Sequence, residues 1–135
     1  MNNKIILMGL LSFLTSFISC KDNSTFKSVE IDEFETVIKD STVVLLDVRT
    51  PEEFAESHID KAININVTQV NFNEQALNVL PKNKTIAVYC RSGRRSKKAA
   101  NELSKIGYRV VELNKGFNSW VNADKKVVNS TEEAL

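Results

Sequence analysis

The chain has 135 residues, of which 42% are hydrophobic and 26% are charged, a composition typical of one globular domain. Four glycines and two prolines exclude collagen-like and low-complexity chains, while two cysteines and one histidine exclude a disulfide scaffold and argue against a Cys/His zinc site. A net charge of +1 gives no general attraction to nucleic acid, so we expect no nucleic-acid partner.

The N-terminal segment predicts an export signal. Residues 5–19 carry no charge and are mostly large and apolar, with Lys4 before them and Lys21 after them. The run is shorter than the roughly twenty residues that a spanning helix needs, and a basic start with small residues at the end is typical of a secretory signal. The ending Phe-Ile-Ser-Cys at residues 17–20 resembles a bacterial lipobox, which implies that Cys20 is lipidated and becomes the mature N-terminus.

We therefore expect residues 1–19 to be a lipoprotein signal peptide and residues 20–28 to be a polar tether. The protein would be exported and lipid-anchored through Cys20 to a bacterial membrane, facing the periplasm. A short anchor that happens to end in cysteine and an ordinary signal peptide cleaved elsewhere remain as alternatives. With Cys20 lipidated, Cys90 would have no disulfide partner, and an unpaired thiol in an oxidising compartment suggests chemistry.

Helix and strand patterns alternate between residues 29 and 123, and residues 124–135 form a polar C-terminal tail. This alternation predicts an α/β fold with a mostly parallel sheet and helices on both faces. In chain order the patterns predict a helix at 30–39, a strand at 42–48, a helix from Pro51, a strand at 62–67, a helix at 71–80, a strand at 85–89, a helix at 96–106, a strand at 109–113 and a short helix around 117–121.

Cys90 directly follows the predicted strand at 85–89, at the sheet edge where ligands bind in parallel sheets. The loop after it leads into a helix, so its amides can form an anion-binding nest and the helix start adds positive potential. From Arg91 to Lys105 six basic side chains stand against one acidic one, a local charge of +5. Such surroundings favour a reactive thiolate, and Gly93 would let the backbone approach a substrate closely.

Three sequence motifs stand out in this part of the chain. The first is the loop Cys-Arg-Ser-Gly-Arg-Arg-Ser at residues 90–96. The second is Leu-Asp-Val-Arg-Thr-Pro-Glu-Glu-Phe at residues 46–54, followed by His58-Ile59 and by Ala-Ile-Asn at 62–64; the third is Leu-Asn-Lys-Gly-Phe at 113–117 with Trp120. Together these motifs resemble those of single-domain rhodaneses, and the resemblance covers about residues 29–121. Ser57, Lys61 and Lys115 stand where the family often has Gly.

The resemblance implies a rhodanese-like domain over residues 29–123, built on a five-stranded sheet, and sulfurtransferase activity. Cys90 would take the outer sulfur of a donor such as thiosulfate, hold it as a persulfide and pass it to a thiol or to cyanide, without metal or organic cofactor. Asp47 and Arg49 would support the loop by a charge-assisted pair, and His58 and Trp120 would belong to the framework. Substrate binding would fall to Arg91, Ser92, Gly93, Arg94, Arg95 and Ser96, with Arg91 and Arg94 holding the charged end of the donor.

Other functions of a cysteine loop fit less well. Phosphatases use Cys-x5-Arg, and Ser96 stands where that Arg would be, so the loop is one residue short. The chain has no Cys-x-x-Cys for thioredoxin-type chemistry. A persulfide carrier of the cell envelope, which takes sulfur from one partner and delivers it to another without turnover, remains the main alternative. A protein donor or acceptor therefore stays open beside small sulfur donors and thiol acceptors.

Overall fold

The computed structural model describes residues 25–131. The predicted signal peptide, Cys20, the first part of the tether and residues 132–135 lie outside the described residues.

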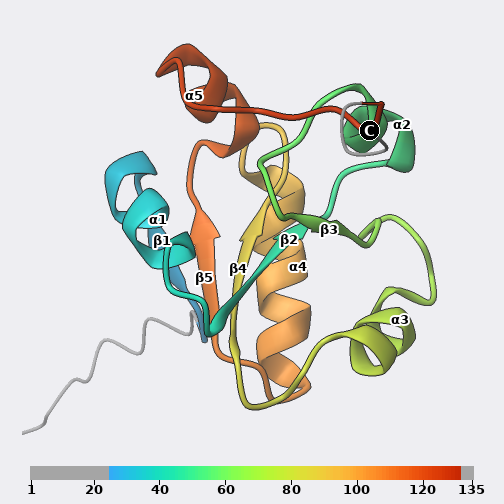
Figure 1. The fold of residues 1–135 in the computed structure, drawn as a ribbon. Coiled ribbons are helices and arrows are strands. Elements are labelled where there is room, and N and C mark those ends of the chain that lie inside the picture. Colours follow the sequence, from blue (N-terminus) through green and yellow to red (C-terminus); the bar gives the residue numbers. More distant parts are fainter. Residues whose placement is uncertain (1–24, 132–135) are drawn as a thin grey trace, which may run out of the picture.

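The domain is a sheet of parallel strands with helices on both faces, as the sequence predicts (Figure 1). The elements in chain order are β1 (Lys27–Val29), α1 (Ile31–Ile38), β2 (Val43–Asp47), α2 (Pro51–Glu56), β3 (Ile63–Asn64), α3 (Phe72–Val79), β4 (Thr85–Tyr89), α4 (Arg94–Lys105), β5 (Val110–Leu113) and α5 (Gly116–Asn122). The sheet order is β1-β5-β4-β2-β3, and all four neighbouring pairs are parallel. The central strand β4 therefore ends at the same edge as its neighbours β2 and β5.

Alternation along β4 divides the core into two layers, because successive side chains of a strand point to opposite faces. Ile86, Val88 and Cys90 pack in the layer beneath α3 and α4. Ala87 and Tyr89 pack in the other layer, with residues of α1 and α5. Cys90 thus lies on the α4 side of the sheet, continuous with the apolar core.

Two parts of the chain differ from their predictions. β1 includes Lys27 and Ser28, which belong to the predicted tether, because Lys27–Val29 pairs with β5 and closes one edge of the sheet. The predicted strand at 62–67 forms a paired strand only at Ile63–Asn64. Residues beyond it still bond to the end of β2, since the Val67 N–H donates to the Val48 carbonyl.

The first part of the predicted tail is docked on the domain. Val128 forms an antiparallel bridge with His58, and the Trp120 indole N–H donates to the Lys126 carbonyl at 2.8 Å. Figure 1 shows this segment running from α5 back to α2. The tail therefore connects the two elements that border the carboxyl edge of the sheet.

Candidate functional site

Cys90 stands directly after β4 at the carboxyl edge of the sheet, and its side chain is almost fully buried at 1% exposure. The Gly93 N–H donates to its sulfur at 3.1 Å, so the loop closes over the thiol. Cys90 is a free cysteine. A backbone N–H aimed at a sulfur stabilises negative charge there, as a nucleophilic thiolate or persulfide requires.

Gly93 allows a close approach of the cysteine loop to another part of the protein. Gly93 is the N-cap residue directly before α4, and its φ is +102°, which residues other than glycine rarely adopt. A Cβ at this position would lie 1.9 Å from the Asn114 carbonyl oxygen. The glycine is therefore required where the cysteine loop packs on the turn between β5 and α5.

The start of α5 fixes the cysteine loop from the other side. The Phe117 N–H donates to the Cys90 carbonyl at 2.8 Å, and the Asn118 N–H donates to the Arg91 carbonyl at 3.0 Å. Gly116, with a φ of +63°, brings the two segments together, because a Cβ there would lie 2.5 Å from the Arg91 carbonyl oxygen. The loop carbonyls are thus held against α5.

Asp47 and Arg49 form the expected ion pair after β2. Both are buried, and the guanidinium donates to the carboxylate through Nε at 3.0 Å and Nη2 at 2.7 Å. The same Nη2 donates to the Ser57 carbonyl, and the guanidinium lies 4.2 Å from the centre of the Phe117 ring. Burial, the largest single influence, lowers the pKa of Arg49, but the hydrogen bonds to Asp47 and the negative charges of Asp47 and Glu53 together raise it. Arg49 therefore remains a fixed cation beside the cysteine loop.

Arg95 is paired with Glu53, an acidic residue far from it in the sequence. Its guanidinium forms two hydrogen bonds of 2.9 Å to the carboxylate of Glu53 on α2. These bonds raise the pKa of Arg95 and lower that of Glu53, against the opposing effect of partial burial. Arg95 thus joins α2 to the start of α4, and the substrate contact predicted for it stays a prediction.

Ser96 is buried and points to the sheet. Its hydroxyl group donates to the Glu112 carboxylate at 2.6 Å, and its oxygen lies 3.4 Å from the Cys90 sulfur. Glu112 is itself fully buried and lies 3.3 Å from the Lys97 ammonium. The local charge counted along the sequence is therefore offset by Glu53 and Glu112, which come from other elements.

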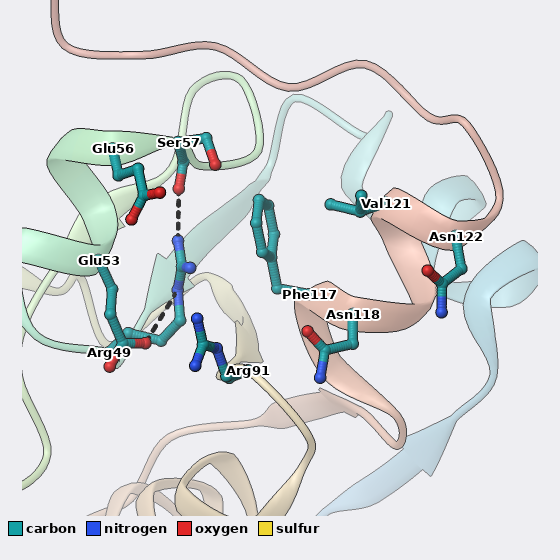
Figure 2. A pocket seen from close by; sticks show the side chains of 9 residues that line it. All are labelled: Arg49, Glu53, Glu56, Ser57, Arg91, Phe117, Asn118, Val121 and Asn122. Atoms are coloured by element: carbon teal, nitrogen blue, oxygen red, sulfur yellow. Dashed lines mark hydrogen bonds and ion pairs between the residues drawn. The ribbon is translucent and has the colours of Figure 1, made fainter.

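The remaining predicted loop residues face outward. Ser92 and Arg94 are exposed, and Arg91 is exposed at the rim of a pocket of about 370 Å³. Figure 2 shows Arg91 and Arg49 on the same side of this pocket, across from α5. Its lining is Arg49, Glu53, Glu56, Ser57, Arg91, Phe117, Asn118, Val121 and Asn122. The lining combines two arginines, two glutamates and two asparagines beside the cysteine loop, which suits a small polar ligand.

His58 and Trp120 are both buried, which agrees with the framework role predicted for them. His58 is fully buried, stacks on Phe54 at 3.7 Å between ring centres, and bonds the Phe54 carbonyl through Nδ1 at 2.7 Å. Trp120 is buried in the layer of α1 and α5. Within residues 25–131 there is no group of three His, Cys, Asp or Glu side chains placed to hold a metal ion. Over the same range, no helix has the length and apolar character needed to cross a membrane.

A parallel α/β sheet with a free thiol in a strand–loop–helix turn at its carboxyl edge defines a class of cysteine-loop proteins. The family model for the rhodanese-like domain matches residues 30–123, and the chain belongs to this family. Membership in this family accounts for both the three sequence motifs and the five-stranded sheet.

Three known proteins illustrate the similarity. Thiosulfate sulfurtransferase PspE of Escherichia coli is 43% identical over 68 residues, which cover 50% of this chain and 64% of PspE. The "Putative sulfur carrier protein YrkF" of Bacillus subtilis is 32% identical over 104 residues, covering 76% of this chain and 55% of YrkF. The crystal structure of a rhodanese-related protein from Thermoplasma volcanium superimposes with a TM-score of 0.68 at 31% identity, covering 76% and 98% of the two chains. The chain thus spans less than two thirds of either curated relative.

Proposed function

We propose that the protein is a sulfurtransferase that moves sulfane sulfur from a donor such as thiosulfate to a thiol or cyanide through a persulfide on Cys90. The observation that carries this proposal is the Cys90 sulfur facing the Gly93 N–H within the loop, 3.1 Å away. Membership in the rhodanese-like family and the sulfurtransferase among its relatives support it.

The reaction has two displacement steps. The Cys90 thiolate attacks the outer sulfur of thiosulfate, the S–S bond of the donor breaks, and sulfite leaves with the electron pair. The acceptor thiolate or cyanide then attacks the outer sulfur of the persulfide, and the Cys90 thiolate leaves. The Gly93 N–H stabilises negative charge on the cysteine sulfur, and the cations Arg49 and Arg91 attract the anionic donor to the pocket.

Cys90→Ser tests the proposal directly. Serine is close in size and its hydroxyl is a far weaker nucleophile at neutral pH, so we expect thiosulfate:cyanide transfer to be lost while the fold is retained. In the wild type, incubation with thiosulfate should add the mass of one sulfur atom to the peptide that contains Cys90. Substantial transfer by Cys90→Ser, with the circular dichroism of the wild type, would show that the reacting group lies elsewhere.

A persulfide carrier is the second candidate, and the sulfur carrier among the relatives favours it. A carrier needs the same loop but passes its sulfur to a specific partner. Stable loading of Cys90 with negligible release to cyanide or small thiols would indicate a carrier, whereas rapid turnover with these acceptors would indicate an enzyme.

We further propose that the protein is exported and lipid-anchored through Cys20. The start of β1 supports a particular orientation: Lys27 lies at the amino edge of the parallel sheet, opposite to the carboxyl edge that holds Cys90. A tether to Cys20 would then leave the site facing away from the membrane. Cys20→Ser should remove an acyl mass and shift the protein from the detergent to the aqueous phase, and equal partitioning of both forms would contradict the anchor.

A further inference from the structure

Glu112 is a buried carboxylate that the sulfur-transfer steps do not use. It lies on β5 facing α4 and is fully buried. The Ser96 hydroxyl donates to its Oε1 at 2.6 Å and the Ser28 hydroxyl donates to its Oε2 at 2.6 Å. The Lys97 ammonium lies 3.3 Å from Oε1. One hydroxyl group therefore separates this carboxylate from the Cys90 thiol.

Because the Ser96 hydroxyl has a single proton, it can donate a hydrogen bond to only one of its two neighbours, Glu112 and Cys90. A serine hydroxyl has one proton, and an ionised carboxylate only accepts hydrogen bonds. Because Ser96 donates its proton to Glu112, its oxygen meets the Cys90 sulfur, 3.4 Å away, as an acceptor. The protonated thiol can donate to that oxygen, whereas a thiolate would face its lone pairs.

We propose that Glu112 is a positioning residue that fixes the direction of the Ser96 hydroxyl and thereby favours the protonated thiol of Cys90 in the free protein. The inference rests on Cys90 being the reacting thiol of the proposed function. When Cys90 ionises, its proton passes to water, while the Ser96 hydroxyl stays directed at Glu112 and presents its lone pairs to the sulfur. Glu112 keeps its contacts with Ser28 and Lys97 in that state.

The other charges around the thiol are already paired or are unchanged by the test. Arg95 of α4 interacts with the Cys90 charge and pairs with Glu53 of α2. Arg49 pairs with Asp47 after β2, Lys97 pairs with Glu112, and the exposed Arg91 and Arg94 flank the loop. The α5 helix has no ionisable side chain. A change caused by substituting Ser96 or Glu112 therefore reports on this hydrogen-bonded chain.

The sign of the effect of Ser96→Ala is the first test. The full-length protein is treated with iodoacetamide across a pH series, and the rate of alkylation of the Cys90 peptide is followed by mass spectrometry. We expect Ser96→Ala to lower the pH midpoint of alkylation by about one unit, because the thiol loses its acceptor and the thiolate loses a facing lone pair. If the Ser96 hydroxyl instead donated to the thiolate, the midpoint would rise; a rise or an unchanged midpoint overturns the proposal.

Glu112→Gln is the second test, since glutamine has the same size but is a weaker acceptor. The midpoint should again fall by about one pH unit, because the Ser96 hydroxyl is released to donate to the thiolate. In the Ser96→Ala background the same substitution should change the midpoint by less than about 0.3 unit. An equal fall with and without Ser96 would mean that Glu112 acts through its charge alone, which overturns the proposal.

Ser28→Ala is the matched control, because it removes a hydroxyl from Glu112 Oε2 without touching Ser96. Its midpoint should stay within about 0.3 unit of the wild type. Alkylation requires no sulfur donor, so the outcome does not depend on the proposed activity. A protein with the expected midpoints that transfers no sulfur would refute only the proposed function.

Discussion

At the scale of single residues, the two cations beside the pocket have different tasks. Arg49 is buried and committed to Asp47, whereas Arg91 is exposed at the pocket rim. Buried, fully bonded charges keep one geometry, while an exposed charge is available to an incoming anion. Arg91 is therefore the better candidate for attraction of the donor.

Arg91→Ala should lower kcat/KM for thiosulfate by about ten- to a hundredfold, the value of one charge-assisted contact expressed in the transition state. Transfer from an uncharged organic persulfide should fall much less. Steady-state kinetics with both donors measure the difference, and Lys98→Ala, an exposed cation of α4 outside the pocket, is the control. An equal loss with both donors would show that Arg91 shapes the loop and does not recognise charge.

Lys61 is one of the departures from the family pattern, and its backbone conformation shows why glycine is common there. It stands where the family often has glycine, and its φ is +68°. A side chain in this region of backbone space costs about 1 kcal/mol relative to glycine. The position is exposed, so the lysine itself meets no packing obstacle.

At the scale of elements, the cysteine loop is held by contacts from three others. The turn before α5 packs on its carbonyls, Glu53 of α2 binds Arg95, and β5 supplies Glu112. The loop conformation therefore depends on long-range packing as well as on its own sequence.

Gly116→Ala should disturb this support. Its Cβ would lie 2.5 Å from the Arg91 carbonyl oxygen and 2.7 Å from that of Cys90, and both carbonyls belong to the loop. We expect a loss of at least about 2 kcal/mol in the free energy of unfolding, together with a clear loss of sulfur transfer. Chemical denaturation and the transfer assay measure the two effects.

Gly107→Ala is the matched control for that change. Gly107 also has a positive φ, of +101°, but a Cβ there meets only the flexible end of Lys82. It should lose about 1 kcal/mol of stability from backbone strain and keep its activity per folded molecule. Equal loss of activity in both variants would contradict the role of the turn before α5.

The Glu53–Arg95 pair should make the junction of α2 and α4 sensitive to acid. The hydrogen bonds from Arg95 lower the pKa of Glu53, so the carboxylate contributes stability above its ordinary pKa of about 4.3. That contribution is lost as the pH falls through the lowered pKa of the folded state.

Glu53→Gln should therefore be less stable than the wild type by about 0.5–1 kcal/mol near neutral pH, a modest value because the pair is partly exposed. The difference should shrink as the pH falls below the ordinary pKa of glutamate, and it should vanish once the carboxylate of the folded wild type is protonated. Denaturation of both proteins across the pH range measures it. A difference that is constant with pH would mean that the ionised carboxylate does not stabilise the fold.

At the scale of the whole molecule, the docked tail closes the side of the domain that carries α2 and α5. It bonds to His58 through the backbone and to Trp120 through the indole N–H. Removing residues 124–135 should lower the free energy of unfolding by about 1–3 kcal/mol, since these hydrogen bonds are lost and Trp120 is exposed to water. Hydrogen exchange should increase at His58, and a truncated chain as stable and protected as the wild type would contradict this role.

Much of the fold followed from local patterns. Alternating helix and strand periods predict the α/β class, and Pro51 and the apolar strand at 85–89 mark element boundaries close to those observed. The motif around Cys90 and the Asp47–Arg49 pair are local as well, since Asp47 and Arg49 are two residues apart. Short-range periodicity and motifs are legible in sequence because neighbouring residues determine them directly.

Long-range pairing decided the rest. Lys27–Val29 forms a strand because it pairs with the edge of β5. The tail packs on the domain because its backbone bonds to His58 and to the Trp120 indole. The charges counted from Arg91 to Lys105 predict a strongly positive loop. In the fold, however, Glu53 binds Arg95 from 42 residues away in the sequence. Glu112 likewise binds Ser96 from 16 residues away. The sequence by itself determined which thiol reacts in the proposed chemistry and on which kind of sheet it stands. Only the tertiary structure decided which charges surround that thiol, because contacts between distant elements depend on how the layers pack.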